Sequence, residues 1–195
     1  RLAKFQDVKY SLVPEPQILS LRMLLREYYA ISDMLTELKN RLCTDLYLLF
    51  PGYLDVFSNP FGKASLKILR DYQTPQAILS ENPATLAQMI AKTSRKGLIW
   101  GQKKVAKLVA MAQLCLSMPM EFSILSRKIQ YHLDGIETFQ ANLEGLKDEL
   151  AGMISNVDFP KNIRDSIILL EAMPGIGFLT AATILAEIGD FSRFH

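Results

Sequence analysis

The side chains best suited to chemistry form a cationic stretch in the middle of the chain. Between Asn82 and Met120 the sequence has no Asp or Glu, and six of its side chains are positive: Lys92, Arg95, Lys96, Lys103, Lys104 and Lys107. On a helix, Lys103 and Lys107 share one face, and Trp100 beside them could stack on a base or ribose. Because such charges neutralise phosphates, the stretch predicts salt-dependent nucleic-acid binding. The alternative is a solvated basic face with a packed Trp100. The residues predicted to bind are Arg95, Lys96, Lys103, Lys104 and Lys107.

A second candidate site is the turn Pro174-Gly175-Ile176-Gly177, which resembles the turn of a helix-hairpin-helix motif. Short helices are expected on either side of it, at about 163–172 and 178–188. Such a turn exposes backbone N–H groups at the positive end of the second helix, where a phosphate oxygen binds well. Gly175, Ile176 and Gly177 are therefore predicted to bind nucleic acid, with the Thr180 hydroxyl as a further donor. A purely structural turn is the alternative.

Arrangements typical of an enzyme are missing from the sequence. It has no Ser/His/Asp set in a plausible context, no Walker loop and no metal-ligand spacing. His132 lies among apolar neighbours, and the only other histidine is His195. Glu187 and Asp190 fall near a helix end, where acids usually meet solvent. We therefore predict no catalytic residue, no metal ligand and no cofactor in this chain.

Two long helices are expected to position these features. Apolar residues alternate at three and four positions along each run, which is the pattern of a coiled-coil seam. The seams are Leu21, Leu24, Tyr28, Ile31, Leu35, Leu38, Leu42 and Leu49, with Asp45 included, and Phe122, Leu125, Ile129, His132, Ile136, Phe139, Leu143, Leu146, Leu150 and Met153. They could pack on each other or on a second chain, and the sequence leaves both open. Asp45 and His132 could each fix the register, or could pair.

Residues 59–118 predict shorter helices separated by turns, with Thr74-Pro75 and Asn82-Pro83 as helix starts. No alternation typical of a strand persists, so the fold class expected is all-α. The predicted divisions are 1–16, the end of a preceding domain or a linker; 17–155, a coiled-coil helical domain with the insertion 59–118; and 160–195, a helix-hairpin-helix-like start of a truncated C-terminal domain. Self-association is predicted through Leu35, Leu38, Leu42, Ile129, His132, Ile136 and Leu143.

Composition favours a globular chain in a reducing compartment. The 195 residues are 49% hydrophobic and carry a formal charge of +2, with two cysteines, Cys43 and Cys115. Both cysteines read as small buried residues rather than a disulfide framework. The apolar run from Leu108 to Met120 is too short to span a bilayer, and no signal peptide opens the chain. We expect a cytoplasmic protein that is a piece of a larger one.

Four blocks together resemble the "one-ten" family of bacterial insertion-sequence transposases, to which pilin-gene-inverting recombinases are similar. The blocks are 48–53 (Leu-Leu-Phe-Pro-Gly-Tyr), 59–66 (Asn-Pro-Phe-Gly-Lys-Ala-Ser-Leu), 173–177 (Met-Pro-Gly-Ile-Gly) and 186–194 (Ala-Glu-Ile-Gly-Asp-Phe-Ser-Arg-Phe). In that family an RNase H-like domain with four acidic metal ligands precedes the helical region, and a nucleophilic serine follows it. Ser192 lies too early to match that serine.

The resemblance implies a fragment of a transposase or site-specific recombinase that is non-catalytic by itself. It implies DNA as a partner, a structured guide RNA in members that use one, and a homodimer or higher homo-oligomer; Mg²⁺ would belong to the acidic domain. The alternative is a coiled-coil scaffold that binds another protein and has no nucleic-acid role. A helix-hairpin-helix glycosylase would need a catalytic Asp or Lys after the turn, and long rods do not suit that class.

Overall fold

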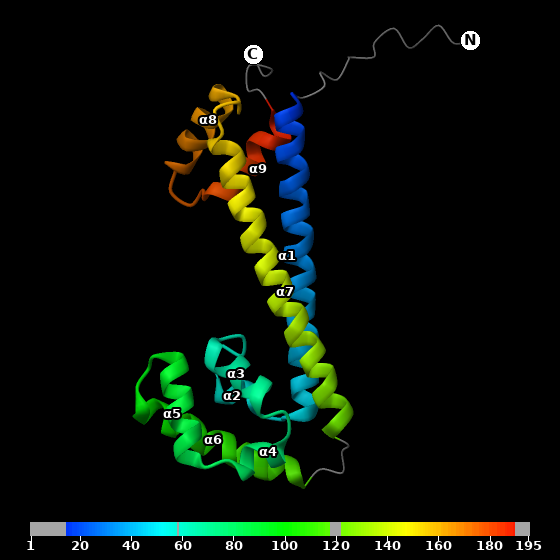
Figure 1. The fold of residues 1–195 in the computed structure, drawn as a ribbon, viewed down its shortest axis with the longest axis vertical. Coiled ribbons are helices and arrows are strands. Elements are labelled where there is room, and N and C mark those ends of the chain that lie inside the picture. The colour runs from blue at the N-terminus through cyan, green and yellow to red at the C-terminus, as the bar shows by residue number, and fades with distance from the viewer. Residues whose placement is uncertain (1–14, 58, 118–121, 190–195) are drawn as a thin grey trace, which may run out of the picture. The chain divides into compact units, whose positions relative to one another are not determined.

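The computed structural model describes residues 15–57, 59–117 and 122–189, and every regular element within them is an α-helix (Figure 1). The all-α prediction is therefore confirmed. Two helices are long, α1 (Pro16–Leu49) and α7 (Phe122–Ser155). Five shorter helices lie between them in the chain: α2 (Tyr53–Val56), α3 (Lys63–Asp71), α4 (Pro75–Ser80), α5 (Pro83–Ser94) and α6 (Leu98–Leu116). After α7 come α8 (Lys161–Glu171) and α9 (Phe178–Ile188). None of these helices is long and apolar enough to cross a membrane.

Helix ends follow local chemistry. Thr74 Oγ1 accepts a hydrogen bond from the Ala77 amide at the start of α4, and Asn82 Oδ1 accepts one from the Ala84 amide at the start of α5. Both are the predicted caps, and each is followed by proline, whose missing N–H costs nothing at that position. Between the end of α1 at Leu49 and the start of α2 at Tyr53, Gly52 adopts a left-handed backbone with φ 88°, which glycine does at little cost.

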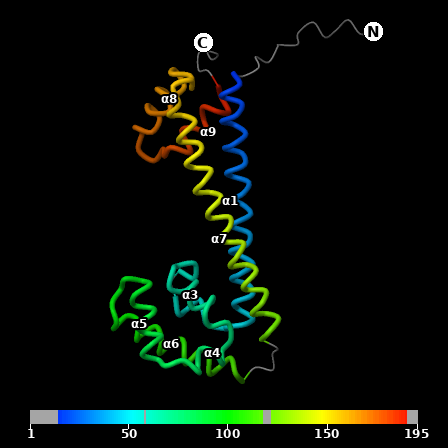
Figure 2. Tube along the Cα trace, viewed as in Figure 1, coloured from blue at the N-terminus to red at the C-terminus, as the bar shows by residue number. Residues whose placement is uncertain are grey.

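The chain divides into two compact units. Unit 1 consists of the described residues of 1–31 and 142–195, and unit 2 of those of 32–141. Both long helices contribute to both units, so this division passes through α1 and α7. The chain path through α1, the short helices and α7 can be followed in Figure 2. The predicted divisions at 16 and 155 coincide with the start of α1 and the end of α7, and as domain boundaries they stay predictions.

Within each unit α1 and α7 pack against each other in the same chain. In unit 2 a Cβ on Gly135 would lie 2.6 Å from Leu38 Cδ2, so the absence of a side chain there permits the close approach of the helices. In unit 1 the Lys147 ammonium lies 5.8 Å from the centre of the Tyr28 ring. Later residues of α1 contact earlier residues of α7, so the two run antiparallel.

Both predicted seams face inward. Every seam position is buried or half-buried, including the seven side chains predicted to mediate self-association. The chain itself covers them, and self-association through them stays a prediction, as does coiled-coil geometry. Of the two cysteines, Cys115 is buried and Cys43 half-buried, both as free thiols, and burial raises the pKa of each.

A buried polar cluster joins α1 to α7 in unit 2. The Asp45 side chain is 3% exposed, and its two carboxylate oxygens contact different partners. Lys128 Nζ donates to Oδ1 at 2.7 Å, and His132 Nε2 lies 2.8 Å from Oδ2. The possible pairing of Asp45 with His132 is thus confirmed, and Lys128 adds a contact that the seam pattern does not reveal. A buried carboxylate needs such partners, because its desolvation is otherwise uncompensated.

We expect Asp45→Ala to lower the free energy of unfolding by about 2 kcal/mol, because His132 loses its partner inside the interface and Lys128 loses its acceptor at the edge of it. Chemical denaturation followed by circular dichroism measures the change.

Glu37→Ala is the matched control on the same helix, since Glu37 pairs with Arg41 on the exposed side of α1. An exposed pair of this spacing is worth less than about 0.5 kcal/mol. Equal losses in the two variants would show that the Asp45 cluster does not stabilise unit 2.

Candidate nucleic-acid interface

The cationic stretch occupies the end of α5, the following loop and the first turns of α6. α5 ends at Ser94; Arg95, the next residue, has a left-handed backbone with φ 58°, and Gly97 follows with φ 80°. The two positive φ angles reverse the chain. A Cβ on Gly101 would lie 2.4 Å from the Ala87 carbonyl oxygen, so α6 approaches the α5 backbone closely. This packing holds Arg95 and Lys96 near Trp100.

The cations of this stretch are not paired with carboxylates in the described residues. Lys92, Arg95, Lys96, Lys103 and Lys107 are exposed, and Lys104 is half-buried. Within the described residues none of the six pairs with an acid. Of the twelve other cations in the described residues, half contact an Asp or Glu: Arg22, Arg26, Arg41, Lys67, Arg70 and Lys128. The other six have no ion pair within that part of the chain, but they are not clustered along the sequence in a segment without acids. The stretch therefore keeps an uncompensated positive field.

Lys104 differs from its neighbours. Its ammonium donates to the Val56 carbonyl oxygen and lies 5.3 Å and 5.7 Å from the ring centres of Trp100 and Phe57. The pKa of Lys104 is lowered mainly by burial, and the nearby charges of Lys107 and Lys96 lower it further. Lys104 thus holds α6 to the end of α2, while Lys103 and Lys107 remain extended toward solvent.

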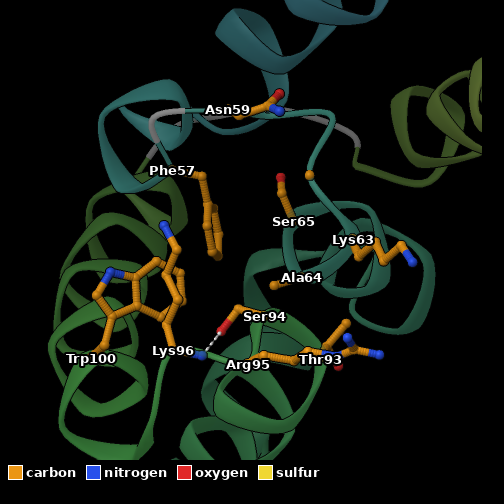
Figure 3. A pocket seen from close by; sticks show the side chains of 11 residues that line it. Phe57, Asn59, Lys63, Ala64, Ser65, Thr93, Ser94, Arg95, Lys96 and Trp100 are labelled. Carbon is orange, nitrogen blue, oxygen red and sulfur yellow. Dashed lines mark hydrogen bonds between the residues drawn. The ribbon is translucent and has the colours of Figure 1, made fainter.

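A cleft of about 340 Å³ opens beside this stretch in unit 2 (Figure 3). Phe57 and Trp100 form one side of it, Ala64 and Ser65 of α3 lie opposite, and Arg95 is at its base. The wall is completed by Asn59, Gly62, Lys63, Thr93, Ser94 and Lys96. Sequence reasoning identified Trp100, Arg95 and Lys96 but missed Phe57, Lys63 and Ser94, because their proximity depends on how α2 and α3 pack.

Tyr53 fixes the α2 side of the cleft. It is fully buried, and its hydroxyl lies 3.0 Å from both the backbone oxygen and the Oγ of Ser65. Burial raises the pKa of the Tyr53 phenol far above its ordinary value. The Phe57 ring stacks at a tilt on Tyr53, with the ring centres 5.6 Å apart. This contact aligns Phe57 with the cleft.

The second predicted site, the Pro174–Gly177 turn, lies in unit 1 between α8 and α9. Pro174, Gly175 and Gly177 are exposed, and Gly175 has φ 90°. A Cβ added to either glycine would meet nothing within 4 Å, so the space outside the turn is open. No side chain caps α9, and this leaves its first N–H groups to solvent or a ligand. Thr180 is exposed as well. A helix-hairpin-helix assignment stays a prediction.

Small residues seat α9 in the unit 1 core. Ala181, Ala182, Leu185 and Ala186 are at most 1% exposed, and the lack of long side chains lets α9 lie close to α1. Ile176 packs half-buried against the same core. The two predicted binding regions therefore belong to different units, and each is positioned by its own packing.

Two arginines of α1 hold the end of α9, a contact that the sequence analysis missed. Arg22 Nε donates to the Ala186 carbonyl oxygen at 2.7 Å, and Arg26 donates to both carboxylate oxygens of Glu187 at 2.9 Å each. Glu187 was expected only to meet solvent, whereas the structure pairs it. The hydrogen bond from Arg26 lowers the pKa of the Glu187 carboxyl. The sequence did hold a signal for this contact, because Arg22 and Arg26 are four residues apart and therefore share one face of the helix.

The described residues contain no group of three or more His, Cys, Asp or Glu side chains that could hold a metal ion. His132 serves the α1–α7 interface. Asp190, Ser192 and His195 lie outside the described residues.

We expect α9 to loosen in acid. Because the pKa of Glu187 is lowered in the folded chain, its contact with Arg26 stabilises the fold above the ordinary carboxyl pKa of 4.5 and is lost as the pH falls through the lowered value. Hydrogen exchange of the α9 amides, corrected for the intrinsic pH dependence, should show reduced protection in that range.

Glu187→Gln should remove this pH dependence and reduce α9 protection already at pH 6. Glu171→Gln is the control, since Glu171 is an exposed acid of the same unit for which the described residues provide no ion pair. Protection that falls equally in both variants would contradict a specific role for the Arg26 contact.

Comparison with known proteins identifies the C-terminal segment. Residues 168–195 match the family model described as Transposase IS116/IS110/IS902 family. The match starts inside α8 and includes the Pro174–Gly177 turn and α9. A comparison with curated proteins gives no match, and a comparison with solved structures gives none either. The resemblance drawn from the sequence is thereby confirmed for its C-terminal blocks, where the chain is similar to the IS116/IS110/IS902 transposase family.

Proposed function

We propose that this chain is a nucleic-acid-binding and oligomerising part of a transposase or site-specific recombinase, and that it holds DNA without cutting it. The observation that carries the proposal is the set of unpaired cations on α5 and α6 in a chain whose C-terminal segment matches a transposase family. Phosphate contacts from such cations position a duplex without reading its sequence.

Energetics favour the cationic segment as a phosphate site. Elsewhere in the described chain, paired arginines and lysines would have to break contacts with acids before they could bind a phosphate. Arg95, Lys96, Lys103 and Lys107 have no such contacts to break. Binding there releases condensed counterions from the nucleic acid, which makes the affinity depend strongly on salt.

The Pro174–Gly177 turn is proposed as a second phosphate contact. Its glycines are exposed, the space outside them is open, and α9 lacks a side-chain cap. The free N–H groups and the helix dipole at this end favour an anion. The Thr180 hydroxyl, exposed one turn into α9, is proposed as an additional donor.

Further partners extend the proposal. DNA is the principal partner, a structured guide RNA a second one, and a homodimer or higher homo-oligomer the working assembly in the cytoplasm. Because the chain covers its own seams, sedimentation at several concentrations is the direct test of self-association. Mg²⁺ is assigned to the acidic domain that the family resemblance implies.

The second candidate function is a protein-interaction scaffold. It is favoured by exposed apolar side chains such as Ile168 and Leu169 on α8, which are 60% and 67% exposed. A scaffold would bind DNA weakly and with little response to salt.

We expect Lys103→Glu with Lys107→Glu to weaken duplex DNA binding and to reduce the slope of log affinity against log salt by about 2, one for each lost phosphate contact. Both side chains are exposed, so the fold should persist. Fluorescence anisotropy with labelled duplexes across a salt series gives the slope. Lys104 is left unchanged because it supports the fold.

Arg127→Glu with Lys161→Glu is the matched control, because it makes the same change in net charge at exposed cations outside the stretch. The proposal requires the slope to change much less in the control. If both pairs of substitutions lower affinity equally, or the parent chain shows no salt response, the scaffold function is favoured.

Gly177→Ala should weaken DNA binding several-fold while leaving the fold intact. Gly177 has φ −91°, which any residue adopts, and an added methyl group meets nothing within 4 Å. The methyl group would, however, occupy the space through which a phosphate approaches the turn. Anisotropy measures the binding, and thermal unfolding checks the fold.

Gly175→Ala is the contrasting variant, because it should destabilise the fold as well. Alanine adopts φ 90° poorly, which lowers the free energy of unfolding by about 1 kcal/mol or more. A Gly177→Ala chain that binds DNA as tightly as its parent would make the turn purely structural.

A further inference from the structure

The cleft beside Trp100 has the composition of a nucleotide site rather than of a duplex-binding surface. Its volume of about 340 Å³ is at the small end of the roughly 300–1,000 Å³ range of small-molecule pockets. One side is aromatic, from Phe57 and Trp100, with the Lys96 side chain alongside Trp100, and Arg95 is at the base (Figure 3). No Asp or Glu is among the described residues that line it.

The aromatic side suits a base. Phe57 is held by Tyr53 and is only 4% exposed, whereas Trp100 is half-buried at the start of α6, so Trp100 presents the more accessible aromatic surface. The Lys96 and Lys104 ammonium groups lie 5.0 Å and 5.3 Å from the centre of the Trp100 ring. Lys104 is held in place by the Val56 carbonyl oxygen, so Lys96 is the cation that a ligand can displace. A cation binds the electron-rich face of an indole ring, and a base stacks on that same face.

The polar side suits a phosphate. Arg95 and Lys96 are exposed and free of acids, and Lys63 of α3 lines the opposite wall. The Ser94 hydroxyl oxygen accepts a hydrogen bond from the Lys96 amide at 3.3 Å, which orders the loop that carries both cations. Arg95 keeps a left-handed backbone that glycine would adopt more easily.

We propose that this cleft binds one unpaired nucleotide, with its base against Trp100 and Phe57 and its phosphate at Arg95 and Lys96. The inference rests on the proposed nucleic-acid function and adds to it a preference for unpaired positions. A base inside a duplex has both faces stacked, so only a bulged, looped or single-stranded nucleotide can enter a concave site. The entering base displaces Lys96 from the Trp100 ring, and the freed ammonium moves to the phosphate.

Trp100 supplies the test, since it is the sole tryptophan of the chain. Its fluorescence is recorded while the full chain is titrated with a blunt DNA duplex, the same duplex with a one-nucleotide bulge, and matching bulged and fully paired RNA duplexes. Stacking predicts quenching by the bulged ligands only, and roughly tenfold tighter binding of bulged than of fully paired ligand, a usual effect for one stacked base. The DNA and RNA pairs show which nucleic acid supplies the nucleotide.

Arg95→Gly removes the guanidinium while suiting the left-handed backbone, so it should fold at least as well as the parent. It is expected to lose most of the preference for bulged ligands. Trp100→Phe should retain the preference in anisotropy measurements and Trp100→Leu should lose it, with circular dichroism confirming that both chains fold. Lys103 is an exposed cation outside the cleft, so Lys103→Gln should weaken the binding of bulged and fully paired ligands equally.

The outcomes separate this inference from the proposed function. Salt-dependent binding with equal affinity for bulged and fully paired ligands and no Trp100 quenching overturns the inference and leaves the function standing. The same holds if Arg95→Gly or Trp100→Leu keeps the full preference. Absence of binding to every nucleic acid overturns both.

Discussion

Each unit of the chain depends on the packing of α1 against α7. In unit 1 this interface includes Leu21 and Leu150, and in unit 2 it includes Ile129 and Ile136, all at most 2% exposed. Two helices in water bury only one stripe each, so each unit adds helices that cover the pair. Unit 1 adds α8 and α9, and unit 2 adds the short helices α2–α6. The features proposed to contact nucleic acid lie on these added helices, which leaves the long pair free to serve as a support.

The cations at the contacts of α1 and α7 differ from those on α5 and α6 in whether they are paired with acids. Where α1 and α7 join each other or hold other helices, three cations are paired with acids: Lys128 with Asp45, Arg26 with Glu187, and Arg70 with Asp134 and Glu137. On α5 and α6 the cations have no acids, and the net charge of +2 hides this difference. Paired charges add little to solubility or steering, whereas an unpaired cluster attracts polyanions over a distance set by the ionic strength.

Sequence patterns predicted the elements well and the contacts between them only in part. Helical periodicity located α1 and α7, and turn residues located the ends of α4, α5 and α9, because these signals are local. The pairing of Asp45 with His132 was foreseeable once both occupied seam positions. Lys128, the Arg22 and Arg26 contacts and the wall formed by Phe57 were not, because they depend on how helices distant in sequence are aligned. The cleft was therefore visible only as an isolated Trp100 among cations.

The way the chain is divided has a consequence for the order in which it acquires structure. Unit 2 is formed by one continuous segment of the chain, residues 32–141. Unit 1 joins the early residues of α1 to α8 and α9, more than a hundred positions later. During synthesis the ribosome must release α9 before Leu21 and Leu25 can be covered. The first turns of α1 thus keep their apolar side chains exposed to solvent while unit 2 is already able to form.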